Sequence, residues 1–571
     1  MSGRYHSGLE HSGKTADLGP SGRSAEAGRM NKSEAGRKLH LRLRHCGFAL
    51  ASLAVLNLAG CSTGPVRYAG DLYTVADFYG GVIADEPRAT LVGRDMLAAG
   101  GNAADAMVAM YFAMAVTMPS SAALGGGGVC IAHKIGEKKA VTTNVIDFLP
   151  RAAAGGKVAV PGNVRGMAAL WAAFGKMRWA ELVSPGENLA VAGTPVSRAL
   201  AKDIAAAGQV MRDDPQMAGF YVRPDGQLLG ESDNLRQTQL AGILGHVRAQ
   251  GASAFYSGPL AQRLSDAAEA IGAPLTMDDL RNFKVNMYAP LEIPYGDQTV
   301  YLPQPPAAGG ISTAQMLTIL QKEPDKADHR AHFLAEASMR VMADRSNWMK
   351  PGGDVSGDVA NLVSSDHTDQ LMASYQGSHA TAATALTPPA QPRPENPWSA
   401  SAIAVDLDGT AVACDFTMNA LFGAGRIAGD TGVLLAPAPD DQGAGFSALS
   451  PMMVANSHNG EFYYASVATG GMPGALSEAV ILHEVLDGEV TLDKALLEPR
   501  IFHNGTPDKV FYESGADSSV LTAVGHQVEE QNGLGIVNAI FCPGGAPTRP
   551  DSCVMRNDYR GNGLSSFYSK H

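Results

Sequence analysis

The sequence lacks the surplus of basic residues that nucleic-acid binding requires. It contains 44 Lys and Arg residues against 56 Asp and Glu residues, which gives a formal net charge of −12. Proteins that bind DNA or RNA neutralise phosphates with clustered Lys and Arg side chains. The composition therefore argues against a nucleic-acid partner. An acidic surface favours solubility and by itself says little about a substrate.

The chain also lacks the patterns that hold metals and phosphorylated cofactors. Cys and His residues do not occur at zinc-binding spacing, so the sequence predicts no metal site. Four glycines, Gly125–Gly128, lead into the strand-like segment Val129–His133, but neither a Walker lysine nor the order G-x-G-x-x-G accompanies them. Phosphate binding is one interpretation of this loop, and close backbone packing is the favoured one. No cofactor is expected.

Long apolar runs are absent except for one near the N-terminus, which is too short to span a membrane as a mature helix. Phe48–Ala59 follows the basic run Arg37–Arg44 and fits the hydrophobic region of an export signal. It leads into Leu58-Ala59-Gly60-Cys61, which resembles the lipobox of bacterial lipoproteins, where Cys61 accepts a diacylglyceryl group. These features predict a periplasmic, lipid-anchored protein with its true start at Met30. A plain signal peptide with an incidental cysteine is the alternative.

The length and composition predict a large globular body after this leader. With 571 residues, of which 45% are apolar and 18% charged, the chain needs two cores or one large two-layer α/β body. Residues 381–398 are rich in Ala, Thr and Pro, which is the composition of an exposed linker. We therefore divide the chain into a disordered leader with its lipoprotein signal (1–61), a tether (62–75), a first part of the body (76–380), the linker (381–398) and a second part of the body (399–571).

Six cysteines are present: Cys46, Cys61, Cys130, Cys414, Cys542 and Cys553. The first lies in the signal and the second would be lipidated. The last two bracket a loop rich in Pro and Gly, so in an oxidising compartment they are a reasonable disulfide pair.

Two strand-like segments follow the linker, residues 399–405 and 410–419, and a short loop ending in Gly409 joins them. A short loop with Gly at the left-handed position is a common hairpin solution. In one register Ser399 lies near Thr417, so a hydroxyl at the start of one strand faces a second hydroxyl. From spacing alone, an ordinary edge hairpin with surface Ser and Thr side chains is the favoured interpretation.

A series of short motifs runs through the chain from residue 89 onward. They are Ala89–Ala109 (ATLVGRDMLAAGGNAADAMVA), Ser120–Val129 (SSAALGGGGV), Val160–Gly166 (VPGNVRG), Gly251–Leu260 (GASAFYSGPL), Pro274-Leu275-Thr276, Pro303–Gly310 (PQPPAAGG), Ala335–Arg345 (AEASMRVMADR) and Thr417–Gly425 (TMNALFGAG). In content and order they resemble the γ-glutamyltransferase family. Each motif alone is a weak signal, but the ordered set is highly specific.

The resemblance implies a four-layer αββα sandwich of the N-terminal-nucleophile hydrolase type, which matures by cutting its own backbone. The residue behind the cut becomes the N-terminus of a small fragment. Its hydroxyl attacks the γ-glutamyl carbonyl, and its own α-amine serves as the base. An α-amino group titrates at about 7.7–8.0, whereas a lysine titrates at about 10.4. One residue can therefore supply both nucleophile and base.

The family motif Asp406-x-Asp408-Gly409 places the nucleophile at Ser399. The family usually has Thr-Thr-His here, whereas this chain has Ser399-Ala400-Ser401. A serine keeps the hydroxyl but lacks the β-methyl group that stiffens threonine, so slower chemistry or slower self-cleavage is expected. Ser401 is the competing candidate.

The resemblance assigns further catalytic residues in the second part of the body. Thr417 would support the free amine and the nucleophile, and Asn419 would bind the backbone end of the glutamyl group. Thr469–Ala475 (TGGMPGA) resembles the oxyanion loop of the family, with one extra residue. By that match the backbone N–H groups of Gly474 and Ala475 would face the tetrahedral oxyanion.

The residues at the positions where the family binds the charged end of the substrate differ from the family pattern in two places. Asp441 matches the residue that pairs with the α-ammonium group, and Ser447 matches the first of two serines that bind the α-carboxylate, but the second position is Ala448. The family also has an arginine close to the position of Asp147, where this chain offers Arg151 behind a proline. Losing the guanidinium fork and the second serine together would weaken recognition by about 2–4 kcal/mol.

The sequence therefore predicts an exported, self-processing hydrolase or acyltransferase that cleaves γ-glutamyl amides such as glutathione through an ester on Ser399. Its partners would be the small-molecule substrate, water or an amine acceptor, the membrane through the lipid anchor, and the large and small fragments of the chain itself. A related acylase for a different acyl group, glutaryl-like or cephalosporin-acylase-like, is the second hypothesis. A catalytically weakened, lipid-anchored family member is the third.

Overall fold

A computed structural model describes residues 78–136, 140–323, 329–350, 353–386, 395–440, 442–487 and 490–569. All of them belong to one unit, Pro65–His571. The apolar run at 48–59, Cys61 and the tether lie outside the described residues, so the predicted lipid anchor stays a prediction. In the described ranges, no helix combines the length and the apolar character that crossing a bilayer requires.

The first sheet contains the hairpin that the sequence predicted. Among the described residues, its strands follow the order β18 (Leu564–Ser569), β1 (Phe78–Ala84), β9 (Ala400–Asp406), β10 (Ala411–Thr417), β2 (Gly127–Ile135), β3 (Val141–Asp147) and β6 (Asn286–Tyr288). Every residue of β9 and β10 is buried. The edge-hairpin interpretation is wrong, because β1 and β2 flank the pair on either side.

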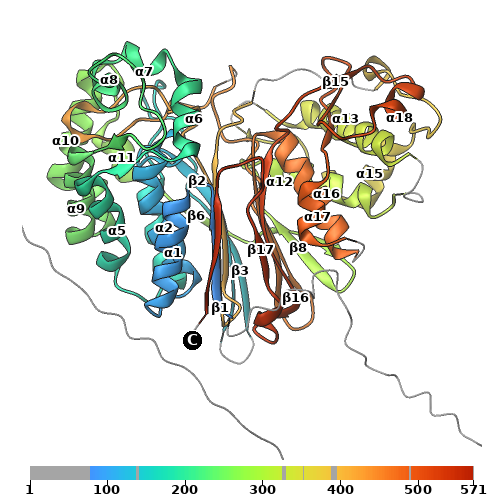
Figure 1. The fold of residues 1–571 in the computed structure, drawn as a ribbon, viewed down its shortest axis with the longest axis horizontal. Helices are drawn as coiled ribbons and strands as arrows, with labels where there is room; N and C mark the ends of the chain where they lie inside the picture. Colours follow the sequence, from blue (N-terminus) through green and yellow to red (C-terminus); the bar gives the residue numbers. More distant parts are fainter. Residues whose placement is uncertain are drawn as a thin grey trace, which may run out of the picture. The chain divides into compact units, whose positions relative to one another are not determined.

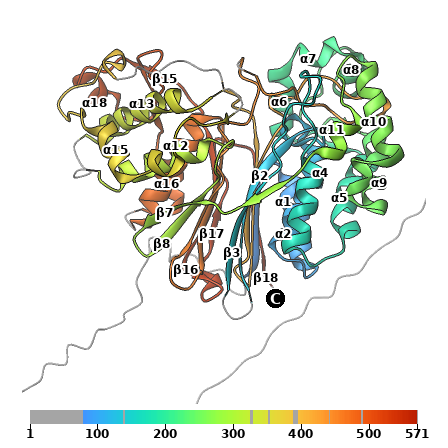
Figure 2. The same ribbon diagram turned by 180° about the vertical axis from the view of Figure 1, so that it is seen from behind.

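A second sheet packs face to face with the first. Its described strands follow the order β17 (Val554–Arg556), β16 (Ile536–Ala546), β12 (Phe462–Thr469), β11 (Met452–Asn456), β8 (Gln298–Leu302) and β7 (Leu291–Tyr295). Apolar side chains from both sheets, among them Ile403, Ala413, Val467 and Ile540, fill the space between them. Figures 1 and 2 show the two sheets in the centre with helices outside both. This is the four-layer αββα sandwich that the resemblance implied.

Helices cover the outer faces of the two sheets (Figure 1). On the side of the first sheet lie α1 (Pro87–Ala98), α2 (Ala103–Thr117), α4 (Asn163–Phe174), α5 (Trp179–Ala192), α6 (Arg198–Ala207), α9 (Thr238–Gln250) and α10 (Gly258–Ala270). On the side of the second lie α12 (Gly309–Leu320), α13 (Arg330–Trp348), α16 (Met472–Leu486) and α17 (Leu492–Leu497). Shorter described elements are α3 (Pro119–Ala122), α7 (Val210–Asp213), α8 (Pro215–Tyr221), α11 (Met277–Asn282), α14 (Val359–Leu362), α15 (Ser365–Met372), α18 (Ser518–Ala523), β4 (Thr194–Pro195), β5 (Asn234–Leu235), β13 (Ile501–His503), β14 (Val510–Tyr512) and β15 (Val528–Glu530).

The Gly-rich loop before β2 is filled by neighbouring backbone. A Cβ atom on Gly125 would come within 2.0 Å of the carbonyl oxygen of Leu434, and one on Gly126 within 2.3 Å of that of Thr417. Real Cβ atoms do not approach that closely, so these positions accept only glycine. The close-packing interpretation is confirmed.

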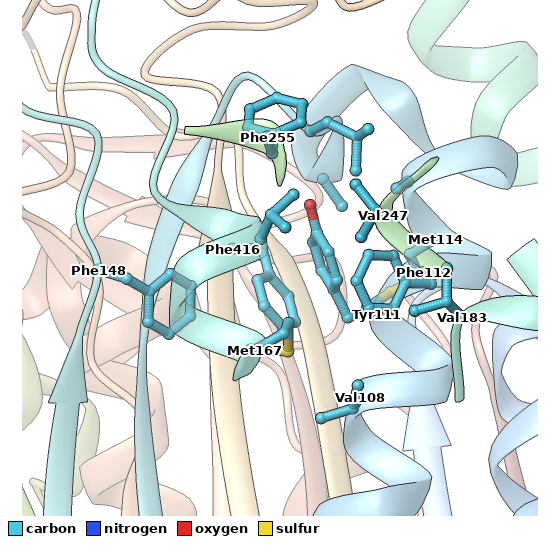
Figure 3. Close-up of a cluster of buried hydrophobic side chains, with 14 of the residues drawn as sticks. Val108, Tyr111, Phe112, Met114, Phe148, Met167, Val183, Val247, Phe255 and Phe416 are labelled. Atoms are coloured by element: carbon cyan, nitrogen blue, oxygen red, sulfur yellow. The ribbon is translucent and has the colours of Figure 1, made fainter. Parts of the chain in front are cut away.

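An aromatic core fixes the end of β10 on the helix side of the first sheet. The ring centroid of Phe416 lies 5.1 Å from that of Tyr111 and 6.1 Å from that of Phe148. Figure 3 shows these rings packed together with Phe112 and surrounding aliphatic side chains. Because side chains alternate along a strand, the next residue, Thr417, faces the second sheet. The core therefore holds the backbone that carries Thr417 and leaves its hydroxyl on the opposite face.

Two disulfides lie in the described part of the chain. Cys542–Cys553 is the pair that the sequence suggested. Cys130–Cys414 joins facing positions of β2 and β10 and links the body before the linker to the body after it. The sequence did not point to this second pair, because its members are 284 residues apart and only the fold brings them together.

We expect Cys414→Ala to lower stability more than Cys553→Ala. A disulfide stabilises mainly by restricting the unfolded chain, and the loops closed span 284 and 11 residues. On the chain-entropy scale the two losses should differ by about 3 kcal/mol. Thermal unfolding without reductant measures the difference, with both variants and their reference made in a Ser399→Ala background so that the chain stays whole and both loops stay closed. Equal losses would contradict the expectation.

Candidate active site

Ser399 lies one residue before β9, where the linker enters the first sheet, and it is half-buried. In the pairing of β9 with β10, Phe416 stands opposite Ala400. Continuing this register by one residue puts Thr417 opposite Ser399, as the sequence predicted. Residues that stand opposite each other share a face, so both hydroxyl-bearing side chains face the second sheet.

Two side-chain donors hold the peptide carbonyl in front of Ser399. The Thr417 hydroxyl donates to the carbonyl oxygen of Trp398 at 3.2 Å, and the Asn396 amide donates to the same oxygen at 2.9 Å. Two donors on one carbonyl oxygen stabilise the negative charge that forms when a nucleophile attacks its carbon. Sequence reasoning missed Asn396 because it lies in the Pro-rich linker and matched no motif.

A buried carboxyl group, Asp415, lies beside the Ser399 hydroxyl. It comes from β10 and faces the same side as Thr417. Burial raises the pKa of Asp415 well above its usual range; contact with the Ser399 hydroxyl opposes this shift, and the nearby Asp85 adds to it. The site therefore favours the protonated acid. The signal that could have found Asp415 is a lone charged residue in the otherwise uncharged strand AVACDFT.

Ser401, the competing nucleophile, is fully buried and already hydrogen-bonded. The amide of Asn538 donates to the Ser401 hydroxyl oxygen at 2.7 Å and to a carboxylate oxygen of Asp85 at 2.7 Å. The backbone N–H of Ser401 donates to the other oxygen of Asp85 at 2.7 Å. This network ties β9 to β16, and the arrangement favours Ser399 as the reacting hydroxyl.

The side-chain N–H groups of Asn419 donate to backbone carbonyls near the site. Asn419 is fully buried, and its side-chain amide donates to the backbone carbonyls of Pro150 at 3.0 Å and Pro437 at 2.9 Å. Its backbone N–H donates to the Thr417 hydroxyl oxygen at 3.0 Å. In the uncut chain both amide protons are therefore taken, while the side-chain oxygen of Asn419 has no hydrogen-bond partner. The role in binding the glutamyl group stays a prediction.

Ser447 and Arg151, two of the residues predicted to hold the charged end of a substrate, contact carboxylates of the protein. Asp441 lies outside the described residues, so its role stays a prediction. The Ser447 hydroxyl donates to the carboxylate of Glu395 at 3.1 Å. Arg151, with 35% of its side chain exposed, pairs with Asp147. Asp147, four residues earlier in the chain, accepts from the Arg151 guanidinium, and the role of Arg151 as the carboxylate clamp stays a prediction.

The predicted oxyanion amides are not free. Gly474 and Ala475 lie in the first turn of α16, and both N–H groups donate to the carbonyl of Gly471, at 3.0 and 3.2 Å. The helix begins at Met472 and therefore includes both amides, and their role toward the oxyanion stays a prediction. The turn still contacts the linker: the N–H of Gly470 donates to the carbonyl of Pro397 at 3.0 Å.

A cavity of about 480 Å³ opens beside Ser399. The end of the linker, the turn before α16 and residues of α6 line it, including Asp203. The Ser120 hydroxyl donates to the Asp203 carboxylate at 2.6 Å, and burial raises the pKa of Asp203 to about 6. Asp203 is thus a titrating group in the cavity that the Ser399 hydroxyl borders.

A second buried cluster brings together His332, Glu336 and His526 in a geometry that could hold a metal ion. Sequence spacing gave no sign of it, since 194 residues separate the two histidines. Their facing ring nitrogens lie 2.8 Å apart, while the carboxylate accepts the N–H of Thr381 at 2.8 Å and pairs with Arg340. Each potential ligand already has a protein partner, and the contact with Thr381 ties α13 to the start of the linker.

The four layers and the central strand that begins behind Ser399 define a fold of the N-terminal-nucleophile hydrolase class. The crystal structure of a cephalosporin acylase from Bacillus halodurans matches with a TM-score of 0.73 and 20% identity, over 91% of this chain and 100% of that one. The family model for gamma-glutamyltranspeptidase matches residues 89–568, and the chain belongs to this family.

Similar sequences include both hydrolases and acylases. The glutathione hydrolase proenzyme of Escherichia coli (strain K12) is 26% identical over 515 residues, covering 81% of this chain and 88% of that protein. The acylase ACY 1 proenzyme of Pseudomonas sp. (strain V22) is 29% identical over 530 residues, covering 82% and 91%.

The variant Asp203→Asn tests the titrating group of the cavity. Because its folded-state pKa of about 6 lies above the ordinary 3.8, the native state binds more protons than the unfolded state between these pH values. The wild type therefore loses stability from this group as the pH rises through that window, by up to about 3 kcal/mol. The variant lacks this loss. Its free energy of unfolding should therefore rise relative to that of the wild type between pH 4 and pH 7.

Urea unfolding of the variant and the wild type at both pH values measures this gain. Asp278→Asn, at an exposed carboxylate, is the matched control. If Asp203→Asn and Asp278→Asn shift stability equally at the two pH values, Asp203 does not titrate as stated.

Proposed function

We propose that this chain is a self-processing hydrolase or acyltransferase of γ-glutamyl amides such as glutathione, with Ser399 as the nucleophile. The observation that supports this most is the pair of donors, Thr417 and Asn396, on the carbonyl oxygen of Trp398. Membership of the family and relatives named as proenzymes support the same reaction.

Self-cleavage follows from this geometry in balanced steps. The hydroxyl oxygen of Ser399 attacks the carbonyl carbon of Trp398, and negative charge moves to the oxygen that Thr417 and Asn396 contact. The C–N bond then breaks as the nitrogen of Ser399 takes up the hydroxyl proton, which the adjacent Asp415 can relay. The products are an ester and a free α-amine, and water hydrolyses the ester to leave a carboxylate on Trp398.

The new N-terminal residue then carries both groups that turnover requires. Its amine titrates at about 7.7–8.0 and can accept the Ser399 hydroxyl proton near neutral pH. The oxygen attacks the γ-glutamyl carbonyl, the leaving amine takes the proton, and a γ-glutamyl ester forms on Ser399. Water or an amine acceptor attacks this ester and regenerates the hydroxyl.

We also propose that the protein is exported to the periplasm and anchored to a membrane by a lipid on Cys61. The two disulfides in the described part of the chain support an oxidising compartment. Wild-type protein should incorporate labelled palmitate and sediment with membranes, whereas Cys61→Ala should do neither. Equal labelling of the two proteins would contradict the anchor.

The self-cleavage itself is tested on a denaturing gel. Wild-type protein should split into a large fragment ending at Trp398 and a small one beginning at Ser399. Because Cys130–Cys414 joins them, the fragments should separate only under reducing conditions. Asn396→Ala should slow the cut by about 100-fold, the scale of losing one oxyanion donor.

N-terminal sequencing of the small fragment identifies the nucleophile, and Ser399→Ala is the control that should stay whole. A fragment that begins at Ser401 would reassign the nucleophile. Wild-type protein that remains whole after long incubation would favour the third hypothesis, a catalytically weakened scaffold.

One set of observations favours a second candidate, an acylase for a different acyl group. Ala448 offers no hydroxyl, and Arg151 pairs with Asp147, so one family contact to the glutamyl end is missing and a second would have to compete with an internal carboxylate. The similarity to an acylase proenzyme points the same way. Release of p-nitroaniline from a γ-glutamyl anilide and from a glutaryl anilide separates the candidates, because the glutaryl group lacks only the α-amine. Release from the glutaryl compound alone would overturn the γ-glutamyl assignment.

A further inference from the structure

The buried guanidinium of Arg345 is hydrogen-bonded to the carboxylate of Glu395, a residue of the linker. Arg345 lies on α13 with 1% of its side chain exposed. Its Nε and Nη2 atoms donate to the two carboxylate oxygens of Glu395 at 2.9 and 2.8 Å. These parallel bonds match the guanidinium fork to a carboxylate. The Ser447 hydroxyl donates to the same carboxylate at 3.1 Å, which completes a three-donor carboxylate site.

The guanidinium is held in place by groups other than Glu395. Its Nη1 donates to the backbone carbonyl of Ala308 at 3.0 Å and to the Ser312 hydroxyl at 3.3 Å. Its Nη2 also donates to the backbone carbonyl of Ser447 at 3.0 Å, and its carbon lies 5.4 Å from the ring centroid of Trp348. Removal of Glu395 would therefore leave a fixed fork with the Ser447 hydroxyl beside it.

Glu395 belongs to the segment that self-cleavage would release. Its neighbour Asn396 contacts the carbonyl oxygen of Trp398 at 2.9 Å, the Thr417 hydroxyl at 3.0 Å and the carbonyl of Gly445 at 3.1 Å. Adjacent residues of one short segment thus bind the carboxylate site and the reacting carbonyl. A cut after Trp398 turns this segment into a C-terminal end that can leave, whereas Arg345 is fixed in a helix.

We propose that Arg345 and Ser447 form the subsite for the carboxylate of the acyl donor, and that Glu395 fills it as an internal ligand until the chain is cut. A buried guanidinium left with unpaired N–H groups is unfavourable, so the vacated subsite favours the binding of another carboxylate. γ-Glutamyl and glutaryl donors both carry one at the far end of the same carbon chain from the reacting carbonyl.

This assignment gives Arg345 the role that the sequence gave to Arg151. It rests on the proposed function, because it requires the bond before Ser399 to open. It does not depend on which of the two acyl groups is the natural one.

Steady-state kinetics of the mature protein test the subsite with three p-nitroanilides: γ-glutamyl, glutaryl and butyryl. The butyryl compound lacks the carboxylate and is the matched control. In Arg345→Lys, which keeps a charge but loses the fork, KM for each of the two carboxylate substrates should rise at least about tenfold more than KM for the butyryl compound. Equal changes for all three compounds would overturn the proposal. A tenfold rise in Arg151→Ala with none in Arg345→Lys would also overturn it.

A binding measurement keeps the inference testable if Arg345→Lys fails to mature or the protein proves not to cut itself. In a Ser399→Ala background the chain stays whole, and adding Glu395→Ala opens the subsite. Glutarate should raise the Tm of the doubly changed protein by at least about 2 °C at saturation, and neutral glutaramide should not. Neither compound should raise the Tm of Ser399→Ala protein that keeps Glu395. Adding Arg345→Lys to the doubly changed protein should abolish the Tm shift with glutarate.

The two readouts separate the failure of this inference from failure of the proposed function. Wild-type protein that stays whole and turns over none of the anilides overturns the proposed function, while the glutarate shift still decides the subsite. Wild-type protein that is cut and active, with no glutarate shift in the opened chain, overturns the subsite alone.

Discussion

The pairing of β9 with β10 is the constraint on which the rest of the site depends. It places the Thr417 hydroxyl within hydrogen-bond distance of the carbonyl oxygen of Trp398. This carbonyl belongs to the peptide bond whose opening would give Ser399 a free amine. A slip of one residue would turn Thr417 toward the aromatic core, because neighbouring side chains of a strand face opposite ways. Phe416, packed against Tyr111 and Phe148, opposes such a slip. The aromatic core therefore fixes the position of the Thr417 hydroxyl as well as contributing to stability.

Burial controls the charge around the reacting hydroxyl. Asp415 and Asp85 both lie in the interior, and for each of them desolvation is the largest cause of a raised pKa. An ionised Asp415 would attract the α-ammonium form of a new N-terminus at Ser399 and so hold the proton that the base must lose. A carboxyl group kept protonated by burial avoids this pairing and can still pass on a proton. The same desolvation that costs stability therefore favours the free amine.

The sequence was informative where the signal is local and weak where partners are distant. The hairpin register and the close-packed glycines follow from neighbouring residues, and the motif order indicated the four layers. It did not reveal Cys130–Cys414 or the Arg345–Glu395 pair, because each joins residues that only the fold brings together. Nor did it show that the amide of Gly474 lies in the first turn of α16.

If the chain cuts itself as proposed, the contacts of the linker couple maturation to substrate binding. Before the cut, Glu395 occupies Arg345 and Ser447 while Asn396 occupies Thr417, so the proposed carboxylate subsite and the proposed catalytic hydroxyl are both engaged. The same bond opening that creates the amine of Ser399 also detaches the segment that fills the subsite. An uncut chain would therefore lack the base and the vacant subsite together. A substrate could bind only to a molecule that is already able to react with it.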